Sequence, residues 1–205
     1  MTNYKLTYFD FPRSRGEECR LALFAAGVPF EDERLQMPAW QARKASTPFG
    51  ALPVLTVDGR QLAQSNAILR FVGSQHGLHP SEPFEAARHE ALMGAIEDMR
   101  VRMGPIMRIK DEAEKKKARE EVAAGYLQEW GAGIEHEIGN GPFLAGRNLS
   151  VADIKLFVAA TAYMQGTIDY IPATVFSAFP KLTRLVEAVK NHPKVVEWYS
   201  RPAKS

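Results

Sequence analysis

Residues 48–68 read PFGALPVLTVDGRQLAQSNAI, and this segment decides the fold of the chain. The β-rich run over residues 53–57 is followed by Asp-Gly at 58–59, a dipeptide typical of a type I′ turn, and residues 60–63 return as the partner strand. Residues 66–75 then place apolar side chains at helical spacing. A hairpin followed directly by a helix predicts a sheet with helices packed on it.

The segments before the hairpin predict a βαβ unit. Residues 4–8 and 30–35 suit strands, and residues 15–26 between them suit a helix that ends at Gly27. Two consecutive strands that are joined by a helix run parallel in their sheet. Residues 38–46 add a short polar helix or turn before the hairpin.

After a linker at residues 76–83 that contains Gly and Pro, the pattern becomes helical throughout. Helices are expected over residues 84–110, 112–138, 151–165, 180–191 and 193–200. The sequence therefore predicts two domains, a small α/β domain over residues 1–79 and an all-α domain over residues 84–205.

The composition excludes several classes of protein. The formal net charge is only +2, so the chain shows no sign of a nucleic-acid partner. No run of 18 apolar residues and no secretory signal is present, so we expect a cytoplasmic protein without a membrane segment. Cys19 is the only cysteine, which excludes an intrachain disulfide and a Cys-x-x-Cys redox motif. The five histidines form no metal-binding pattern, and we expect no metal.

One local motif has a structural meaning. Ser150 and Asp153 are spaced as a capping box, with Asp in the place of the usual Glu or Gln. Leu149 and Ile154 fit the hydrophobic staple that accompanies such a box. We expect this motif to start a buried helix, so its loss should destabilise the fold without changing the chemistry.

Several short patterns, taken in order and at their spacing, resemble one family. They are Tyr8-Phe9, the segment 15–20 (RGEECR), Trp40 with Lys44, the segment 48–55 (PFGALPVL), the segment 64–68 (QSNAI), the segment 143–146 (FLAG) and the segment 149–153 (LSVAD). Over residues 3–200 the chain resembles the cytosolic glutathione transferases, most closely the sigma class. This resemblance implies an α/β thioredoxin-like N-terminal domain plus an all-α C-terminal domain, in agreement with the element pattern.

The resemblance assigns catalysis to Tyr8, supported by Arg15. The thiolate of glutathione is the nucleophile, and a free thiol is mostly protonated at neutral pH, so the enzyme must favour the anion. A tyrosine hydroxyl that donates a hydrogen bond to the sulfur does so, and a nearby cation acts in the same direction. Arg13 competes with Arg15 for the second role. Without the family pattern, Tyr8 is equally well explained as a core aromatic at a strand end.

Glutathione is held, by the same resemblance, at three further places. A cis peptide between Leu52 and Pro53 would offer the Leu52 backbone to the cysteinyl backbone of glutathione. Ser65 would hold the γ-glutamyl carboxylate at a helix N-terminus, and Gln64 would accept from the γ-glutamyl ammonium. The ordinary explanation of Ser65 is a helix N-cap.

The remaining contacts implied by the family come from two helices. Trp40 and Lys44 would meet the glycyl carboxylate, and their ordinary explanation is a surface helix with one half-buried Trp. Asp98 would reach across a homodimer to the γ-glutamyl ammonium at the neighbouring site, whereas an exposed helix acid is the common fate of an Asp.

A small hydrophobic electrophile would bind between the domains. The candidate wall residues are Phe9, Phe11, Met99, Met103, Met107 and Trp198. Ordinary core packing explains the methionines at least as well, because Met fills irregular gaps. Glutathione is a co-substrate here, and no cofactor is implied.

Two other classes of function compete with a transferase. A redox enzyme on a thioredoxin-like domain needs a reactive cysteine before the first helix, and Cys19 lies within that helix. A non-catalytic relative that binds glutathione or another ligand is the alternative to the enzyme. The chain departs from the sigma pattern in a loop at residues 10–14 that is one residue longer and in Ala51, where a Lys is frequent.

Overall fold

The computed structural model describes residues 2–201, and the outer ends of the two predicted domains, residue 1 and residues 202–205, lie outside the described residues. A four-stranded sheet has the order β2-β1-β3-β4. The strands are β1 (Tyr4–Phe9), β2 (Glu31–Leu35), β3 (Val54–Val57) and β4 (Arg60–Ala63). The strand β1 pairs parallel to β2 and antiparallel to β3, as the βαβ unit and the hairpin predict.

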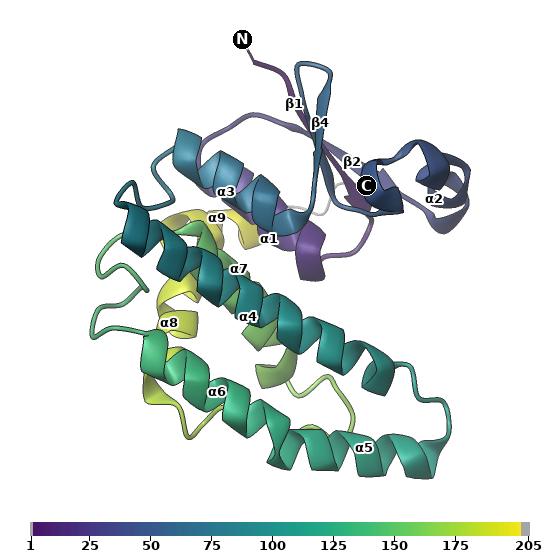
Figure 1. Cartoon of the computed structure of the whole chain (residues 1–205), viewed down its shortest axis with the longest axis vertical. Coiled ribbons are helices and arrows are strands. Elements are labelled where there is room, and N and C mark those ends of the chain that lie inside the picture. Colours follow the sequence, from purple (N-terminus) through teal and green to yellow (C-terminus); the bar gives the residue numbers. More distant parts are fainter. Residues whose placement is uncertain (1, 202–205) are drawn as a thin grey trace.

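Local turn chemistry explains the hairpin. Asp58 and Gly59 both have positive φ angles, 47° and 81°, and this combination defines the predicted type I′ turn. The peptide bond between Leu52 and Pro53, immediately before β3, is cis as expected. The helices α1 (Ser14–Ala25) and α3 (Ser65–Gln75) contact each other beside the sheet, and the short α2 (Met37–Arg43) lies apart from them (Figure 1).

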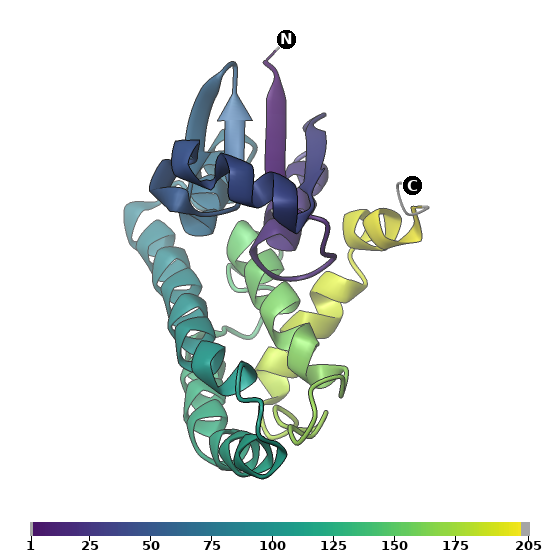
Figure 2. The ribbon, with the colours of Figure 1, turned by 90° about the vertical axis from the view of Figure 1, so that its right-hand side faces the viewer.

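The second half of the chain is helical, as predicted, and most of it lies below the sheet domain in Figures 1 and 2, with α9 beside α1. Its helices are α4 (Pro83–Met107), α5 (Glu112–Ala124), α6 (Tyr126–Glu137), α7 (Val151–Met164), α8 (Pro180–Lys190) and α9 (Pro193–Ser200). The single helix predicted over residues 112–138 is wrong, because the chain breaks at Gly125 into α5 and α6. Gly125 has φ −107° and ψ −95°, a backbone conformation that glycine tolerates better than other residues.

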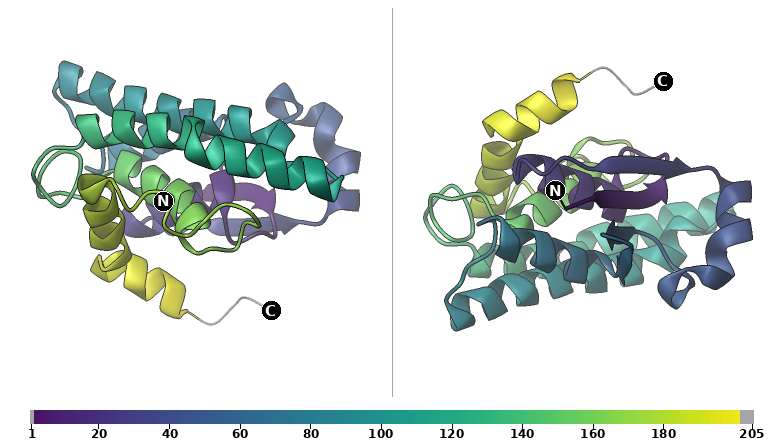
Figure 3. Two further views of the ribbon diagram at one scale, coloured as in Figure 1. Left: turned by 90° about the horizontal axis from the view of Figure 1, so that it is seen from below. Right: turned by 90° about the horizontal axis from the view of Figure 1, so that it is seen from above.

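The helix α7 forms the centre of the molecule. It contacts α1 of the sheet domain as well as α4 and α8. The helices α8 and α9 lie on the side of α7 that faces away from α4 (Figure 3). Its first turn carries the predicted capping box: the Asp153 amide donates to Ser150 Oγ, and the Asp153 carboxylate accepts from the Ser150 amide at 2.8 Å. The contact between α1 and α7 therefore joins the two halves of the chain through buried surface.

Candidate active site

Tyr8 lies near the carboxyl end of β1, where sheets of this kind present their sites. Its side chain is largely buried, and its ring packs against the backbone of Gly16 in the first turn of α1. The Arg20 guanidinium lies 5.7 Å from the centre of the Tyr8 ring. The sheet and α1 thus hold the phenol from two sides.

The electrostatic surroundings keep this phenol protonated. Burial raises the pKa of Tyr8, because the phenolate would lose its hydration, and the Glu18 charge acts in the same direction. The Ser14 hydroxyl and the cations Arg15 and Arg100 oppose this rise without cancelling it. At neutral pH the Tyr8 hydroxyl is therefore a hydrogen-bond donor.

Gly16 is a site residue that the sequence analysis missed. A Cβ built on Gly16 would lie 2.0 Å from Tyr8 Cδ1, so any larger residue must displace the phenol ring. The signal available in the sequence was a glycine inside the first turn of a helix, where glycine costs stability relative to alanine unless packing requires it.

We expect Gly16→Ala to lower the turnover number at least tenfold and to destabilise the fold by about 1–3 kcal/mol, as overpacking usually does. Gly133→Ala is the matched control, because Gly133 lies in α6 with no atom within 4 Å of an added Cβ. The control should keep full activity, and its free energy of unfolding should rise by up to about 1 kcal/mol. Steady-state kinetics and urea denaturation measure the turnover number and the stability of both variants. If Gly16→Ala and Gly133→Ala had the same turnover number and stability, the close packing of Tyr8 on Gly16 would have no effect.

Arg15 is held in place by an ion pair across the domains. Its Nε and one terminal nitrogen donate to Glu97 Oε2 of α4 at 2.8 and 2.6 Å. Arg13, the competing candidate, instead directs its guanidinium to Thr167 Oγ1 at 3.2 Å on the exposed side. Arg15 contributes to the electrostatics of the Tyr8 hydroxyl and Arg13 does not, so the geometry favours Arg15.

The residues at the start of α3 differ in part from expectation. The helix begins at Ser65, and Gln64 is the N-cap, so the prediction of Ser65 as N-cap is wrong. Gln64 has φ 71°, which turns the chain sharply into the helix, and its side chain makes no capping hydrogen bond and is exposed. Ser65 is buried in the first turn, where no side chain caps the amides of the helix. This N-terminus is suited to an anion.

Two of the other predicted contacts to glutathione, Leu52 and Trp40, lie close to β1, and Lys44 and Asp98 lie further along the chain on other elements. The backbone of Leu52 leads into β3, next to β1. Trp40 is buried, with its ring edge-on to Phe9 at a centroid distance of 6.0 Å, and Lys44 follows it in an exposed 3₁₀ turn. Asp98 lies on α4 and is exposed, whereas the next residue, Met99, is buried.

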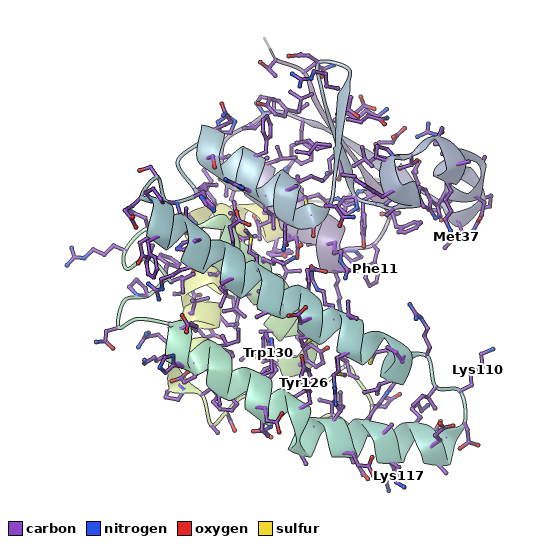
Figure 4. The ribbon with its side chains drawn as sticks, viewed as in Figure 1. Phe11, Met37, Lys110, Lys117, Tyr126 and Trp130 are labelled. Atoms are coloured by element: carbon purple, nitrogen blue, oxygen red, sulfur yellow. The ribbon has the colours of Figure 1, made fainter. Side chains whose placement is uncertain are left out.

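The predicted electrophile wall is brought together only in part. Phe11 lies between the sheet domain and the second half of α4 (Figure 4), and it is exposed, as is Met107. Met99 and Met103 lie in the core, only 1% and 2% exposed, and Met99 Sδ accepts a hydrogen bond from the Tyr163 hydroxyl.

Trp198 lies in a different place from the other candidate wall residues. Its indole Nε1 donates to Glu17 Oε1 at 2.7 Å, and its ring packs on Phe24. It lines a groove of about 520 Å³ between α1, β2 and α9. Neither Tyr8 nor the three methionines line this groove, so the structure separates Trp198 from the Tyr8 site.

A buried charge network under the site was also missed. Lys155 of α7 and Glu18 of α1 are both fully buried, and Lys155 Nζ lies 2.7 Å from Glu18 Oε1. Glu97 and Arg100 of α4 complete the network, with Arg100 bound to Glu18 and to Glu97 at 2.8 Å each. Burial opposes the charge of Glu97, but Lys155, Arg100 and Arg15 outweigh it and lower the pKa of Glu97 to about 2.

The sequence held one signal of this network. Lys155 is the one basic residue in the otherwise largely apolar sequence of α7, and a fully buried lysine requires acidic partners. Which acids meet it is a long-range property, since Glu18 is 137 residues away in the chain.

Cys19 is fully buried, and burial raises the pKa of its thiol well above the ordinary value, so the thiolate is disfavoured. Within residues 2–201, no group of three or more His, Cys, Asp or Glu side chains is arranged to hold a metal ion. None of the helices in this part of the chain combines the length and apolar character needed to cross a membrane.

Comparison with known proteins identifies the class. Two family models match, the N-terminal domain of glutathione S-transferases over residues 4–74 and their C-terminal domain over residues 97–202. Glutathione S-transferase 1 of Ascaris suum is 33% identical over 100% of this chain and 99% of its own length. The hematopoietic prostaglandin D synthase of Gallus gallus is 30% identical over 100% of this chain and 99% of its own.

The solved structures agree. The crystal structure of a monomeric glutathione S-transferase from Necator americanus has a TM-score of 0.87, with 32% identity and 99% of each chain covered. The fold is thus the predicted thioredoxin-like α/β domain with a helical second domain. The chain belongs to the glutathione S-transferase family, and it is an enzyme of that family.

Proposed function

We propose that this enzyme binds glutathione at the edge of the sheet, that Tyr8 stabilises its thiolate, and that the sulfur then forms a bond to a small hydrophobic electrophile. One observation carries this proposal: a buried, protonated phenol lies near the carboxyl end of β1 with the fixed cation Arg15 beside it. A donor of this kind favours the thiolate over the thiol. Each pKa unit by which it lowers the thiol pKa corresponds to about 1.4 kcal/mol.

The peptide is proposed to lie along residues from four elements. The γ-glutamyl carboxylate meets Ser65 and the amides of the α3 N-terminus, and Gln64 accepts from the γ-glutamyl ammonium. The Leu52 backbone pairs with the cysteinyl residue before β3. Trp40 and Lys44 are proposed to meet the glycyl carboxylate, with Lys44 exposed and free to turn toward it.

The electrophile is proposed to bind beside Phe9, Phe11 and Met107. Phe11 and Met107 are exposed, and single exposed apolar side chains on opposite sides of a domain boundary suit an apolar substrate. Membership of the sigma class, and peroxidase or isomerase side activities, are part of this proposal. The isomerase activity is suggested by the relative that is a prostaglandin D synthase.

We further propose a homodimer in which Asp98 reaches the neighbouring site. Asp98 is exposed on α4, and Phe49, which is 81% exposed, is a large apolar side chain that association would cover. The related enzyme from Necator americanus is described as monomeric, so the family membership alone does not fix the oligomeric state. Sedimentation equilibrium of this protein measures it. A monomer at all concentrations would exclude the role of Asp98.

A cytoplasmic location remains a prediction from the sequence.

The proposed reaction is tested by retention on immobilised glutathione together with a conjugation assay on an aromatic halide. We expect both to be positive. Retention without conjugation would favour the alternative, a non-catalytic relative that binds glutathione. Absence of both would contradict the assignment of the peptide site.

A further inference from the structure

The starting observation is that Lys155 is surrounded by three acceptors. Its Nζ lies 2.7 Å from Glu18 Oε1, 2.5 Å from Glu97 Oε1 and 3.5 Å from Ser65 Oγ. The lysine side chain is fully buried, and an ammonium group has three N–H donors and no acceptor. Each donor thus has one partner, and one of these partners is the serine at the start of α3.

The direction of the bond to Ser65 matters for a ligand. Because Lys155 can only donate, Ser65 Oγ must accept, and the hydroxyl proton of Ser65 then points away from the lysine. The side chain of Ser65 stands in the first turn of α3, whose uncapped amides face the same end of the helix. An anion at this N-terminus would therefore receive the serine proton as well as the amide protons.

The charge of the network supports the same conclusion. Two acids, Glu18 and Glu97, are matched by three cations, Lys155, Arg100 and Arg15. Against the effect of burial, Lys155, Arg100 and Arg15 lower the pKa of Glu97 to about 2, so this acid is ionised at neutral pH. One positive charge is left over in the network, and Lys155, its fully buried cation, attracts an anion more strongly than it would in water.

We propose that Lys155 is a positioning residue for glutathione: it fixes the Ser65 hydroxyl as a donor to the γ-glutamyl carboxylate and adds positive charge behind that carboxylate. This inference rests on the proposed function, and it deepens it by naming a residue of α7, in the helical domain, as part of the peptide site. Since Lys155 also binds acids of α1 and α4, it links the packing of the two domains to the affinity for the peptide.

A purely structural role for Lys155 makes a different prediction. A lysine that only joins α1 to α7 would, when removed, loosen the site for every ligand that binds there. A lysine that acts through Ser65 on one carboxylate affects only ligands that carry this carboxylate. The comparison therefore needs two ligands, glutathione and its analogue 4-aminobutyryl-cysteinylglycine, which lacks the α-carboxylate of the glutamyl residue and keeps its ammonium.

The experiment is calorimetric titration of the full chain with both ligands. We expect Lys155→Met to weaken glutathione about tenfold and to leave the affinity for the analogue within twofold of wild type. Lys117→Met is the matched control, because Lys117 lies on α5 with a side chain that is 77% exposed, and it should change neither affinity. In conjugation kinetics, Lys155→Met should raise the KM for glutathione by the same factor and leave kcat within twofold.

Two further variants keep the inference testable. If Lys155→Met folds poorly, Glu18→Gln with Lys155→Met removes the buried acid partner together with the lysine, and the same selectivity between ligands is expected. Ser65→Ala with Lys155→Met should weaken glutathione binding by less than the sum of the two single changes, because both changes remove the hydrogen bond from the same hydroxyl.

The outcomes separate this inference from the proposed function. Equal weakening of both ligands, or no weakening of either, would overturn the role of Lys155. A wild-type protein that binds glutathione without conjugating it would contradict the proposed reaction, while the titrations would still decide on Lys155. Failure of the wild type to bind glutathione would overturn both.

Discussion

Replacing Tyr8 by Phe should lower the turnover number about 10- to 100-fold near neutral pH while glutathione still binds. A hydrogen bond to a charged group contributes about 1.5–3 kcal/mol, and this energy is lost from the thiolate and not from the thiol. The thiol pKa of bound glutathione should rise by roughly 1–2 units in the variant. Because the variant forms its thiolate only at higher pH, its rate should approach the wild-type rate as pH rises.

The measurement is the pH profile of kcat/KM, with the thiolate of bound glutathione followed by ultraviolet absorbance. Tyr4→Phe is the matched control, since Tyr4 lies on the same strand and packs against His76 at the far end of it. The control should keep the wild-type profile. A Tyr8→Phe variant with wild-type rate at every pH would show that another group activates the sulfur.

Local sequence chemistry was enough to predict the sheet domain. Asp58-Gly59 is compatible with very few turns, and the cis bond before Pro53 followed from the resemblance. The break at Gly125 was not predictable, because a single glycine inside a helical pattern is compatible with a continuous helix and only the packing decides. For the same reason the positive φ of Gln64, which shifts the N-cap from Ser65, has no local signal.

In the candidate site, too, some features have a local signal in the sequence and others depend on long-range packing. Tyr8 and Arg15 were proposed from short motifs, and in the structure burial raises the pKa of the Tyr8 hydroxyl while the charge of Arg15 acts on this hydroxyl and lowers its pKa in opposition. The partner of Arg15 is Glu97, from a helix more than eighty residues away, and no local pattern pairs them. Met99 and Met103 share a helical face, but periodicity cannot distinguish a face in the core from a face on a cavity.

The helix α1 explains why the domains cannot be considered separately. Arg15 binds α4, Gly16 receives the Tyr8 ring, and Glu18 binds both α4 and α7. The Arg20 guanidinium binds Asp32 of β2 and donates to the carbonyl oxygens of Phe9, the last residue of β1, and of Phe11 in the loop that follows. A shift of α1 against the helical domain would therefore move Tyr8 and its cation together.

Replacing Asp153 by Ala should destabilise the fold by about 3–5 kcal/mol. The carboxylate is fully buried, and it accepts from the Leu144 amide, the Ser150 amide and the Ser150 hydroxyl at 2.8, 2.8 and 2.6 Å. Removing it leaves these donors without partners away from water, and each unsatisfied donor costs about 1–3 kcal/mol. The total is large because one side chain both starts α7 and holds the segment that leads into it.

Asp111→Ala is the control for Asp153→Ala, because it removes a helix-capping carboxylate that is exposed and not buried. Asp111 is the N-cap of α5 and accepts from the Glu114 amide at 2.9 Å, but it is exposed, so water can replace it. Its loss should cost only about 1 kcal/mol, the usual value of a cap. Urea denaturation at fixed protein concentration measures both, and activity per folded molecule should stay at the wild-type level in each. If the two variants lost equal stability, the buried hydrogen bonds of Asp153 would contribute no more than an exposed cap, and the central position of α7 would have to be explained by apolar packing alone.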